Sequence, residues 1–148
     1  MHADPETIRF WPRPPTRAEL ELQLTNAIYA YEQDGFDFWA LELRDGTFIG
    51  RVGLARRFVN GQGEVEVGYM LRRDTWGHGY ATEAARACRD WAFEHLGLRR
   101  VISLIRPENL RSIEVAKRNG MKRIGSTMHA GAPHDVYAIE RKAWTRGA

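Results

Sequence analysis

The chain has 148 residues, of which 43% are hydrophobic and 28% charged, and it carries a net charge of +3 at pH 7. This composition fits one globular domain over residues 1–148 with a substantial core, and it excludes an intrinsically disordered chain. No apolar run reaches the roughly 18 residues of a membrane span, and the lone Cys88 excludes an internal disulfide framework. The weak positive charge lacks the dense basic stripe of a nucleic-acid-binding protein and suits a small anionic ligand. We therefore expect a cytoplasmic protein without nucleic-acid or membrane partners.

The first half of the chain predicts one helix and then an antiparallel meander of three strands. Thr16 and Glu19 have the spacing of a capping box, and apolar residues at helical spacing follow over residues 17–33. Alternating β-type residues predict strands over residues 36–43, 47–54 and 64–71. The turns between them are expected at Asp45-Gly46 and at residues 61–63, where glycines interrupt the pattern.

The second half predicts an alternation of helices and strands. Helices are expected over residues 81–96 and 109–119, each followed by a glycine, and strands over residues 101–105, 121–127 and 136–141. Cys88 lies on the apolar face of the first of these helices, so we expect it to be buried. The order α, βββ, α, β, α, ββ indicates an α/β domain with a mixed central sheet.

The most informative feature is a glycine-bearing loop, residues 76–80, between a predicted strand and a predicted helix. Backbone amides at a helix N-terminus are unpaired donors, and glycines let a phosphate approach them. Arg72 and Arg73 precede the loop and are expected to add positive charge. The loop lacks the Lys-Ser/Thr ending of a P-loop, and Thr82 replaces the third glycine of the dinucleotide fingerprint. The third phosphate loop that competes with these two is the pyrophosphate loop of acyl-CoA acetyltransferases.

The loop and two later segments resemble the GNAT superfamily of N-acetyltransferases, especially its RimJ/RimL-type branch. The string WGHGYATEA at residues 76–84 is similar to the loop of that branch, although Trp76 stands where the wider superfamily has Arg or Gln. Residues 106–122 resemble the second motif of the branch, and residues 134–144 resemble its closing strand. The resemblance implies a GNAT-like fold, in which an antiparallel meander is followed by a splayed parallel pair of strands and helices flank the sheet. It also implies acetyl transfer from acetyl-CoA to a primary amine, on a protein N-terminus or a small molecule, by direct attack.

By the same resemblance, acetyl-CoA lies along the glycine-bearing loop and the end of the strand before it. Backbone amides of the loop would bind the pyrophosphate, and the pantetheine arm would pair with the strand and contact the cap of the third helix. The residues implied are Met70, Leu71, Gly77, His78, Gly79, Tyr80, Ala81, Thr82 and Asn109. The side chain of His78 is expected to face solvent, and no metal ion is expected.

Glu66 is the expected general base, because it stands where many family members have a catalytic glutamate. An attacking amine must lose its proton, and a carboxylate near the acetyl group can accept it. A solvated strand acid is the alternative interpretation of Glu66 and the expected state of Glu64. His134 and Asp135, near the C-terminal turn, are the alternative bases, since His129 and His134 alone do not make a zinc site.

Ser112, or a water molecule, is the expected proton donor to the leaving thiolate. Ala116 stands where the wider superfamily often has a tyrosine in that role. Asn109 is also a good N-cap with Ser112 at the third helical position, so a structural role for both residues stays open. A non-catalytic acyl-CoA-binding domain would carry the same loop and is the alternative function.

By the resemblance, we expect this chain to lack the strand that normally precedes the Asp-Pro-Glu segment of the family. That strand pairs with the one expected at residues 36–43, whose outer edge would then be open and rich in aromatic residues. An open, flat, apolar edge tends to pair with another chain. We therefore expect a homodimer or aggregation through this edge, unless residues 9–12 or another local segment covers it.

Overall fold

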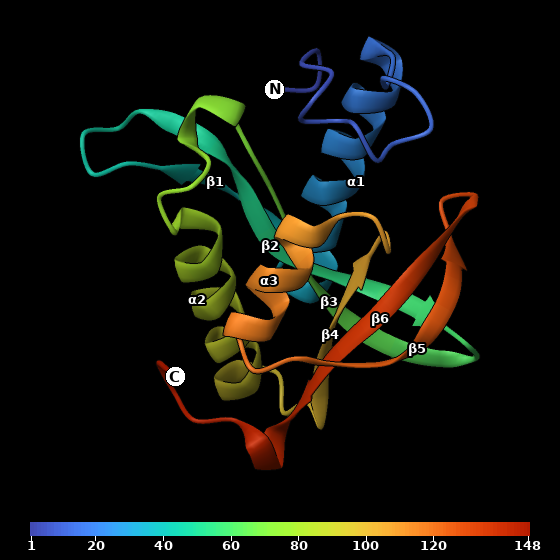
Figure 1. The fold of residues 1–148 in the computed structure, drawn as a ribbon, viewed down its shortest axis with the longest axis vertical. Coiled ribbons are helices and arrows are strands. Elements are labelled where there is room, and N and C mark those ends of the chain that lie inside the picture. The colour runs from blue at the N-terminus through green and yellow to red at the C-terminus, as the bar shows by residue number, and fades with distance from the viewer.

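The computed structural model describes all 148 residues and contains one six-stranded sheet with helices around it (Figure 1). The strands are β1 (Phe38–Glu42), β2 (Phe48–Val59), β3 (Gln62–Leu71), β4 (Arg100–Ile105), β5 (Lys122–His129) and β6 (Ala132–Glu140). The α-helices are α1 (Arg17–Asp34), α2 (Tyr80–His95) and α3 (Leu110–Arg118). The strand order is β1-β2-β3-β4-β6-β5, and only β3 and β4 run parallel. This arrangement confirms the expected fold class and element order.

The core lies between one face of the sheet and the helices α2 and α3, which lie side by side over it (Figure 1). Strand alternation sends Leu54 and Val67 to this face, where they pack with Ala92 and Phe93 of α2. All four side chains are at most 1% exposed. The opposite face of β2 and β3 carries the alternate residues, several of which are charged.

Two hairpins are longer than expected, because their turns contain only two residues. Asn60 and Gly61 join β2 to β3, and Ala130 and Gly131 join β5 to β6, all four with positive φ angles between 49° and 81°. Paired positive φ values give the tight turn whose twist matches that of the strands, so the ladders continue to the turn. The expected end of the second strand at residue 54 and the expected turn at residues 61–63 are therefore wrong.

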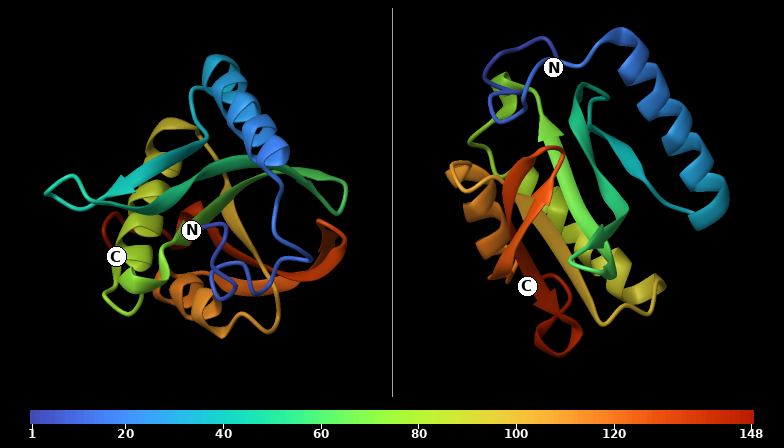
Figure 2. Two further views of the ribbon diagram at one scale, coloured as in Figure 1. Left: turned by 90° about the horizontal axis from the view of Figure 1, so that it is seen from above. Right: turned by 90° about the vertical axis from the view of Figure 1, so that its right-hand side faces the viewer.

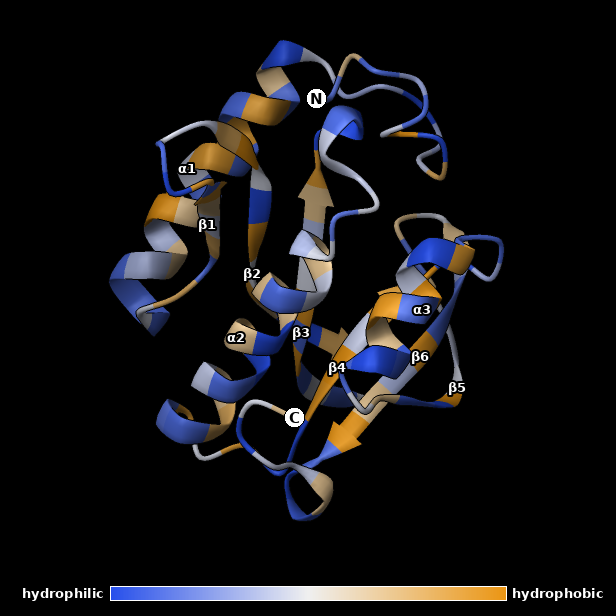
Figure 3. Cartoon of the chain, turned by 60° about the vertical axis from the view of Figure 1, so that its left-hand side comes forward, coloured by the Kyte–Doolittle hydropathy of each residue, from blue (hydrophilic) through white to orange (hydrophobic).

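Helix α1 forms where expected, but several of its apolar side chains are exposed. The capping box is present, with the Thr16 hydroxyl accepting from the Glu19 backbone N–H and the Glu19 carboxylate accepting from the Thr16 N–H. No residue of the helix is buried, and Leu24 and Ile28 are 63% and 54% exposed. Figure 3 shows hydrophobic bands along this helix, which lies beyond the β1 end of the sheet (Figure 2, right). No helix of the structure is long and apolar enough to cross a membrane.

Strand β1 is an edge strand, but it is not the flat aromatic edge that the sequence predicts. Phe36 is 1% exposed, and Trp39 packs edge-on against Trp91 of α2 at 5.7 Å between ring centroids. The Asp37 carbonyl accepts from β2, so the next carbonyl, that of Phe38, points outward. The Tyr31 hydroxyl of α1 donates to this carbonyl at 3.0 Å. Helix α1, and not residues 9–12, thus covers part of the edge, and a homodimer through it stays a prediction.

The packing of α2 against the sheet predicts an unreactive thiol. Cys88 is 6% exposed, and burial raises the pKa of its thiol to about 12. At pH 8 only about one thiol in 10⁴ would be ionised, and the thiolate is the reactive form. We expect no labelling by a disulfide reagent such as DTNB in the native protein and one labelled thiol per chain after denaturation. Labelling of the native protein at the denatured rate would show that α2 does not protect Cys88.

Candidate functional site

The parallel strands β3 and β4 are paired at a single position, Glu66 with Ile102, and separate beyond it. Next to this pair, the Ser103 hydroxyl of β4 donates to the Val67 carbonyl of β3 at 2.7 Å. The backbone groups of Val67 therefore face β4, and those of Tyr69, two residues on, point in the same direction. At Tyr69 no residue of β4 is in register with β3, so its N–H and C=O face an opening between the strands. Such an opening can accept an extended ligand that pairs with backbone.

The glycine-bearing loop follows directly from β3 and is tied back to it. The Trp76 indole N–H donates to the carbonyl of Leu71, the last residue of β3, at 3.0 Å. The guanidinium of Arg111 in α3 lies over the Trp76 ring at 4.6 Å. A tryptophan at this position therefore joins the end of the strand, the loop and α3.

Gly77 and Gly79 give the loop its path and leave its front open. Their φ angles are +80° and +81°, in the left-handed region that favours glycine. A Cβ atom at either position would meet nothing within 4 Å. Gly79 is the N-cap of α2 and offers no side chain to the first amides of the helix, which stay available to an anion.

The other expected loop residues lie around this helix start. His78 is exposed, as expected, with its ring stacked on Tyr80 at 5.5 Å between centroids. Ala81 and Thr82 are half-buried in the first turn of α2. Arg72 does not supply the free positive charge that we expected, because its guanidinium binds Asp74 and the Phe48 carbonyl.

Glu66 occupies the point at which β3 and β4 begin to separate, on the face opposite α2. The residue is 8% exposed, so the interpretation as a solvated strand acid is wrong. Its Oε2 accepts from the Nε of Arg57, on β2, at 2.7 Å. Its Oε1 lies 4.0 Å from the position that a Cβ of Gly68 would take. One carboxylate oxygen is therefore held by a cation, and the other lies along β3 beside Gly68.

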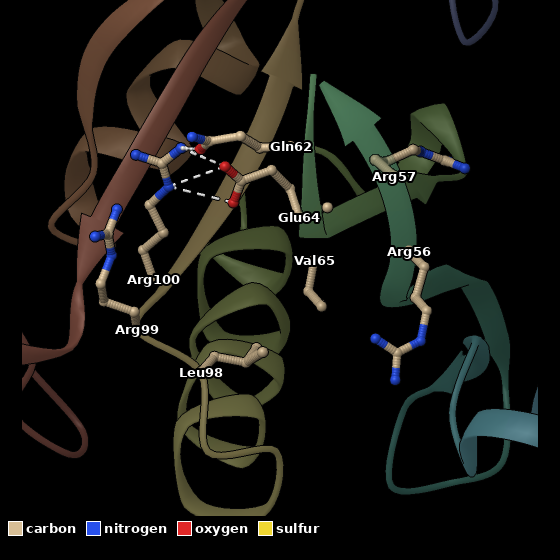
Figure 4. Close-up of a pocket in the computed structure, with 9 residues that line it drawn as sticks. Arg56, Arg57, Gln62, Glu64, Val65, Leu98, Arg99 and Arg100 are labelled. Atoms are coloured by element: carbon tan, nitrogen blue, oxygen red, sulfur yellow. Dashed lines mark hydrogen bonds and ion pairs between the residues drawn. The ribbon is translucent and has the colours of Figure 1, made fainter. Parts of the chain in front are cut away.

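Glu64 is not solvated either, because it forms an ion pair with Arg100 of β4. The pair borders a cavity of about 520 Å³ at the starts of β3 and β4, the end of the strands away from the glycine-bearing loop. Figure 4 shows Glu64 directed to Arg100 on one side of this cavity and Arg57 pointing away on the other. Its charged groups are thus largely paired within the protein, and the cavity does not contain the glycines or the opening described above.

The alternative bases lie on the β5–β6 hairpin. The His129 and His134 rings meet edge-on at 5.2 Å between centroids. Burial, and then the nearby Arg57 and His134, lower the pKa of His129, whereas Glu66 opposes this shift. Asp135 forms an ion pair with Arg123 at 2.9 Å. No group of three or more His, Cys, Asp or Glu side chains is arranged to hold a metal ion.

Asn109 and Ser112 begin α3 beside the opening. Asn109 is the N-cap, and its side-chain oxygen accepts from the Ser112 N–H at 3.2 Å, so the structural role is present. The Tyr69 hydroxyl donates to the Ser112 carbonyl at 3.1 Å, and burial raises the pKa of this phenol to about 12. The sequence analysis missed Tyr69 and the Arg57 partner of Glu66. The hairpin register would have placed Arg57 near Glu66, whereas no local signal identifies the contact of Tyr69 with α3.

Comparison with known proteins agrees with this geometry. The family model described as an acetyltransferase (GNAT) domain matches residues 1–122. The uncharacterized protein YkkB of Bacillus subtilis is 39% identical over 111 residues, which cover 74% of this chain and 63% of YkkB. The chain spans less than two thirds of the length of the curated relatives that it matches.

Solved acetyltransferases have the same fold. The crystal structure of the acetyltransferase from Agrobacterium tumefaciens is 26% identical and superposes with a TM-score of 0.77, over 95% of this chain and 81% of that one. The aminoglycoside acetyltransferase AAC(6')-Ib, in complex with coenzyme A and kanamycin, is 19% identical with a TM-score of 0.77, over 96% of this chain and 86% of that one. At 19% identity the likeness concerns the fold alone.

Because the Ser103 hydroxyl bridges β4 to β3 at the start of the opening, its removal should lower the stability of the protein. Ser103 is 5% exposed, and Ser103→Ala leaves the Val67 carbonyl buried without this donor. We expect the free energy of unfolding, measured by urea denaturation, to fall by about 1–3 kcal/mol. The control Ser126→Ala, on the exposed surface of β5, should change it by less than about 0.5 kcal/mol. Equal stabilities of the two variants would contradict the bridging role of Ser103.

Proposed function

The chain belongs to the GNAT acetyltransferase family, and we propose that it transfers the acetyl group of acetyl-CoA to a primary amine. The observation that carries the proposal is the single pairing of β3 with β4, because it puts the buried carboxylate of Glu66 at the edge of an opening in the sheet. A binding groove and a candidate base thus meet at one point. The WGHGYATEA string supports assignment to the RimJ/RimL-type branch.

The residues of this chain fit two parts of acetyl-CoA, the anionic pyrophosphate and the amide-bearing pantetheine arm. The free amides at the start of α2, behind the open space at Gly77 and Gly79, are suited to a pyrophosphate. The backbone C=O of Tyr69 is suited to accept from a pantetheine amide N–H. The AAC(6')-Ib structure with coenzyme A supports this use of the fold. Met70, Leu71, Tyr80, Ala81, Thr82 and Asn109 surround these groups and complete the proposed donor site.

Glu66 is proposed to accept the proton of the attacking amine at Oε1, the oxygen that Arg57 does not bind. Arg57 fixes the carboxylate by its hydrogen bond to Oε2 and keeps it from rotating away. The bound donor supplies an activated thioester carbonyl. The Tyr69 N–H, which β4 leaves free, is proposed to polarise that carbonyl as the amine attacks it.

Ser112 is proposed to protonate the leaving thiolate through its hydroxyl. Its Oγ forms no hydrogen bond within the chain, and its backbone is held by Asn109 and Tyr69. This direct transfer needs no acyl-enzyme. A non-catalytic acyl-CoA-binding domain is the alternative function, and only turnover separates the two.

Binding of the donor should stabilise the protein. At about 100 times its dissociation constant, acetyl-CoA should add about 2.7 kcal/mol to the free energy of unfolding. For a chain of this size we expect a rise of about 5–11 °C in melting temperature, measured by calorimetry. Gly79→Asp should abolish the rise, because a carboxylate would face the pyrophosphate. A rise with NADPH and none with acetyl-CoA would refute the proposed donor.

Removal of the proposed base should slow turnover but should not prevent the binding of acetyl-CoA. Glu66→Gln keeps the shape and the contact with Arg57, and we expect kcat to fall by about 10²–10⁴-fold, measured as thiol release from acetyl-CoA. The melting-temperature rise with acetyl-CoA should persist in this variant. Glu64→Gln, on the same face of β3, is the matched control and should retain kcat. Full activity of Glu66→Gln together with inactivity of His134→Ala would move the base to the β5–β6 hairpin.

A further inference from the structure

The face of the sheet opposite α2 and α3 is the side from which an acceptor can reach Glu66. On this face Glu66, Gly68 and Met70 follow one another along β3, and their cross-strand partners on β2 are Ala55, Gly53 and Arg51. Directly opposed residues of an antiparallel pair share a face. The intervening residues of both strands face α2 in the core. Arg51 and Glu66 therefore lie on one surface. Arg51 is two residues from Gly53 along β2, and Glu66 is two residues from Gly68 along β3, in the opposite direction from this glycine pair.

The two glycines leave room that the ring of Phe38 fills in part. Gly53 and Gly68 are opposite each other, so neither strand contributes a side chain there. The Phe38 ring of β1 crosses this gap, with its Cζ 2.8 Å from the position that a Cβ of Gly68 would take. The Oε1 of Glu66 lies 4.0 Å from the same position. An apolar floor thus adjoins the free oxygen of the proposed base.

Arg51 lies at the other side of this floor and has no counterion. Its guanidinium is 5.0 Å from the centroid of the Phe38 ring, and its Nε is buried without a hydrogen-bond partner. The other two arginines of β2, Arg56 and Arg57, form ion pairs at 2.8 and 2.7 Å, whereas no carboxylate lies within 4.0 Å of Arg51. Asp37 is near enough only to oppose the lowering of the pKa of Arg51 by burial, and its Oδ1 accepts from the Phe38 N–H.

A second unpartnered nitrogen belongs to the N-terminal segment. The Nε2 of His2, in the N-terminal segment, is also buried without a partner. Burial, and then the charge of Arg51, lower the pKa of His2, so its ring is the less charged of the two groups. Buried polar groups in proteins are almost always hydrogen-bonded, and an exception needs an explanation, such as a bound ion. The guanidinium of Arg51, which keeps its positive charge and has an unpartnered Nε, is therefore the group that calls for an anion.

We propose that Arg51 binds a carboxylate of the acceptor, so that the substrate class is an amine carrying a free carboxylate, such as an amino acid or a short peptide. This inference rests on the proposed function, because it assigns the acceptor side of the same site. A guanidinium matches a carboxylate with two parallel hydrogen bonds. The amine of such a molecule would lie at Glu66, its body on Phe38 and its carboxylate at Arg51. The carboxylates of β3 on this face, Glu64 and Glu66, already pair with Arg100 and Arg57, so a polycationic amine is the poorer match.

Matched pairs of acceptors test the proposal by kinetics. Each pair consists of an amino acid or dipeptide and its C-terminal amide, and thiol release from acetyl-CoA is the readout. We expect kcat/KM to favour the carboxylates by about 10- to 100-fold, through KM, as for a charge-assisted hydrogen bond. Spermidine, a polycation, should be a poorer acceptor than either. A preference for the amides or for spermidine would overturn the proposal.

Variants of Arg51 identify the group responsible. Arg51→Met keeps the stem over Phe38 and should remove the preference for the carboxylates, because kcat/KM should fall more for the carboxylates than for the amides. Arg51→Lys keeps the charge without the planar fork and should retain part of the preference. Arg56→Met is the matched control, because Arg56 also lies on β2 over a phenylalanine ring, Phe36 at 5.3 Å, but on the opposite face. An equal loss of rate with both acceptor types in Arg51→Met would assign Arg51 a structural role.

A binding measurement keeps the two proposals apart. With coenzyme A bound, N-acetylglycine and N-acetylglycinamide serve as product-like probes that need no turnover, and calorimetric titration compares them. We expect wild type to bind the carboxylate about 10-fold more tightly than the amide, and Arg51→Met to bind both alike. Carboxylate binding without turnover of any amine would refute the enzymatic function alone. Equal binding of the two probes by wild type, or loss of acetyl-CoA binding in Arg51→Met, would refute the role of Arg51 toward the acceptor.

Discussion

The pairing of β3 with β4 at a single residue determines most of what this structure can do. Parallel strands normally exchange evenly spaced hydrogen bonds along their length, but here the ladder ends after Glu66 and Ile102. The chain compensates for the lost pairing at both sides of the opening. Ser103 donates to Val67 at its start, and the Trp76 indole donates to Leu71 at its end. The backbone of Tyr69, midway between them, is left to a ligand.

The two faces of the sheet differ in composition and in role. One face is apolar and packs on α2 and α3, which fixes the start of α2 beside the opening. The other face carries charged side chains, most of which are neutralised by neighbours on the same sheet. Glu64 pairs with Arg100, and Glu66 pairs with Arg57. Against this background of completed pairs, the unpaired Arg51 differs from the other arginines of β2, and the difference gives the acceptor side its proposed selectivity.

The periphery of the fold is less complete than its centre. Helix α1 covers part of β1 through Tyr31, yet most of its apolar side chains are exposed. Its capping box and the ion pair of Arg13 with Glu19, which holds the pKa of Glu19 at about 2, are local interactions that would form without the sheet. The helix is therefore stabilised from within, and its position beside the sheet depends on a few contacts. Side chains of this region are therefore held less firmly in place than those on β2 and β3.

The sequence by itself determined the order of helices and strands, the glycine-bearing loop, the caps at Thr16 and Asn109, and the family. These features are local, because periodicity, capping and turn chemistry act over a few residues. It also singled out Glu66, from its place on a strand before the loop. It did not determine the length of the hairpins, since Ala130 in a positive-φ turn has no sequence signal, nor the exposure of α1. Which charges are paired, which carbonyl Tyr69 reaches and why Arg51 lacks a partner were decided only by the tertiary structure, because these contacts join strands and helices that are distant along the chain and depend on the register and spread of the sheet.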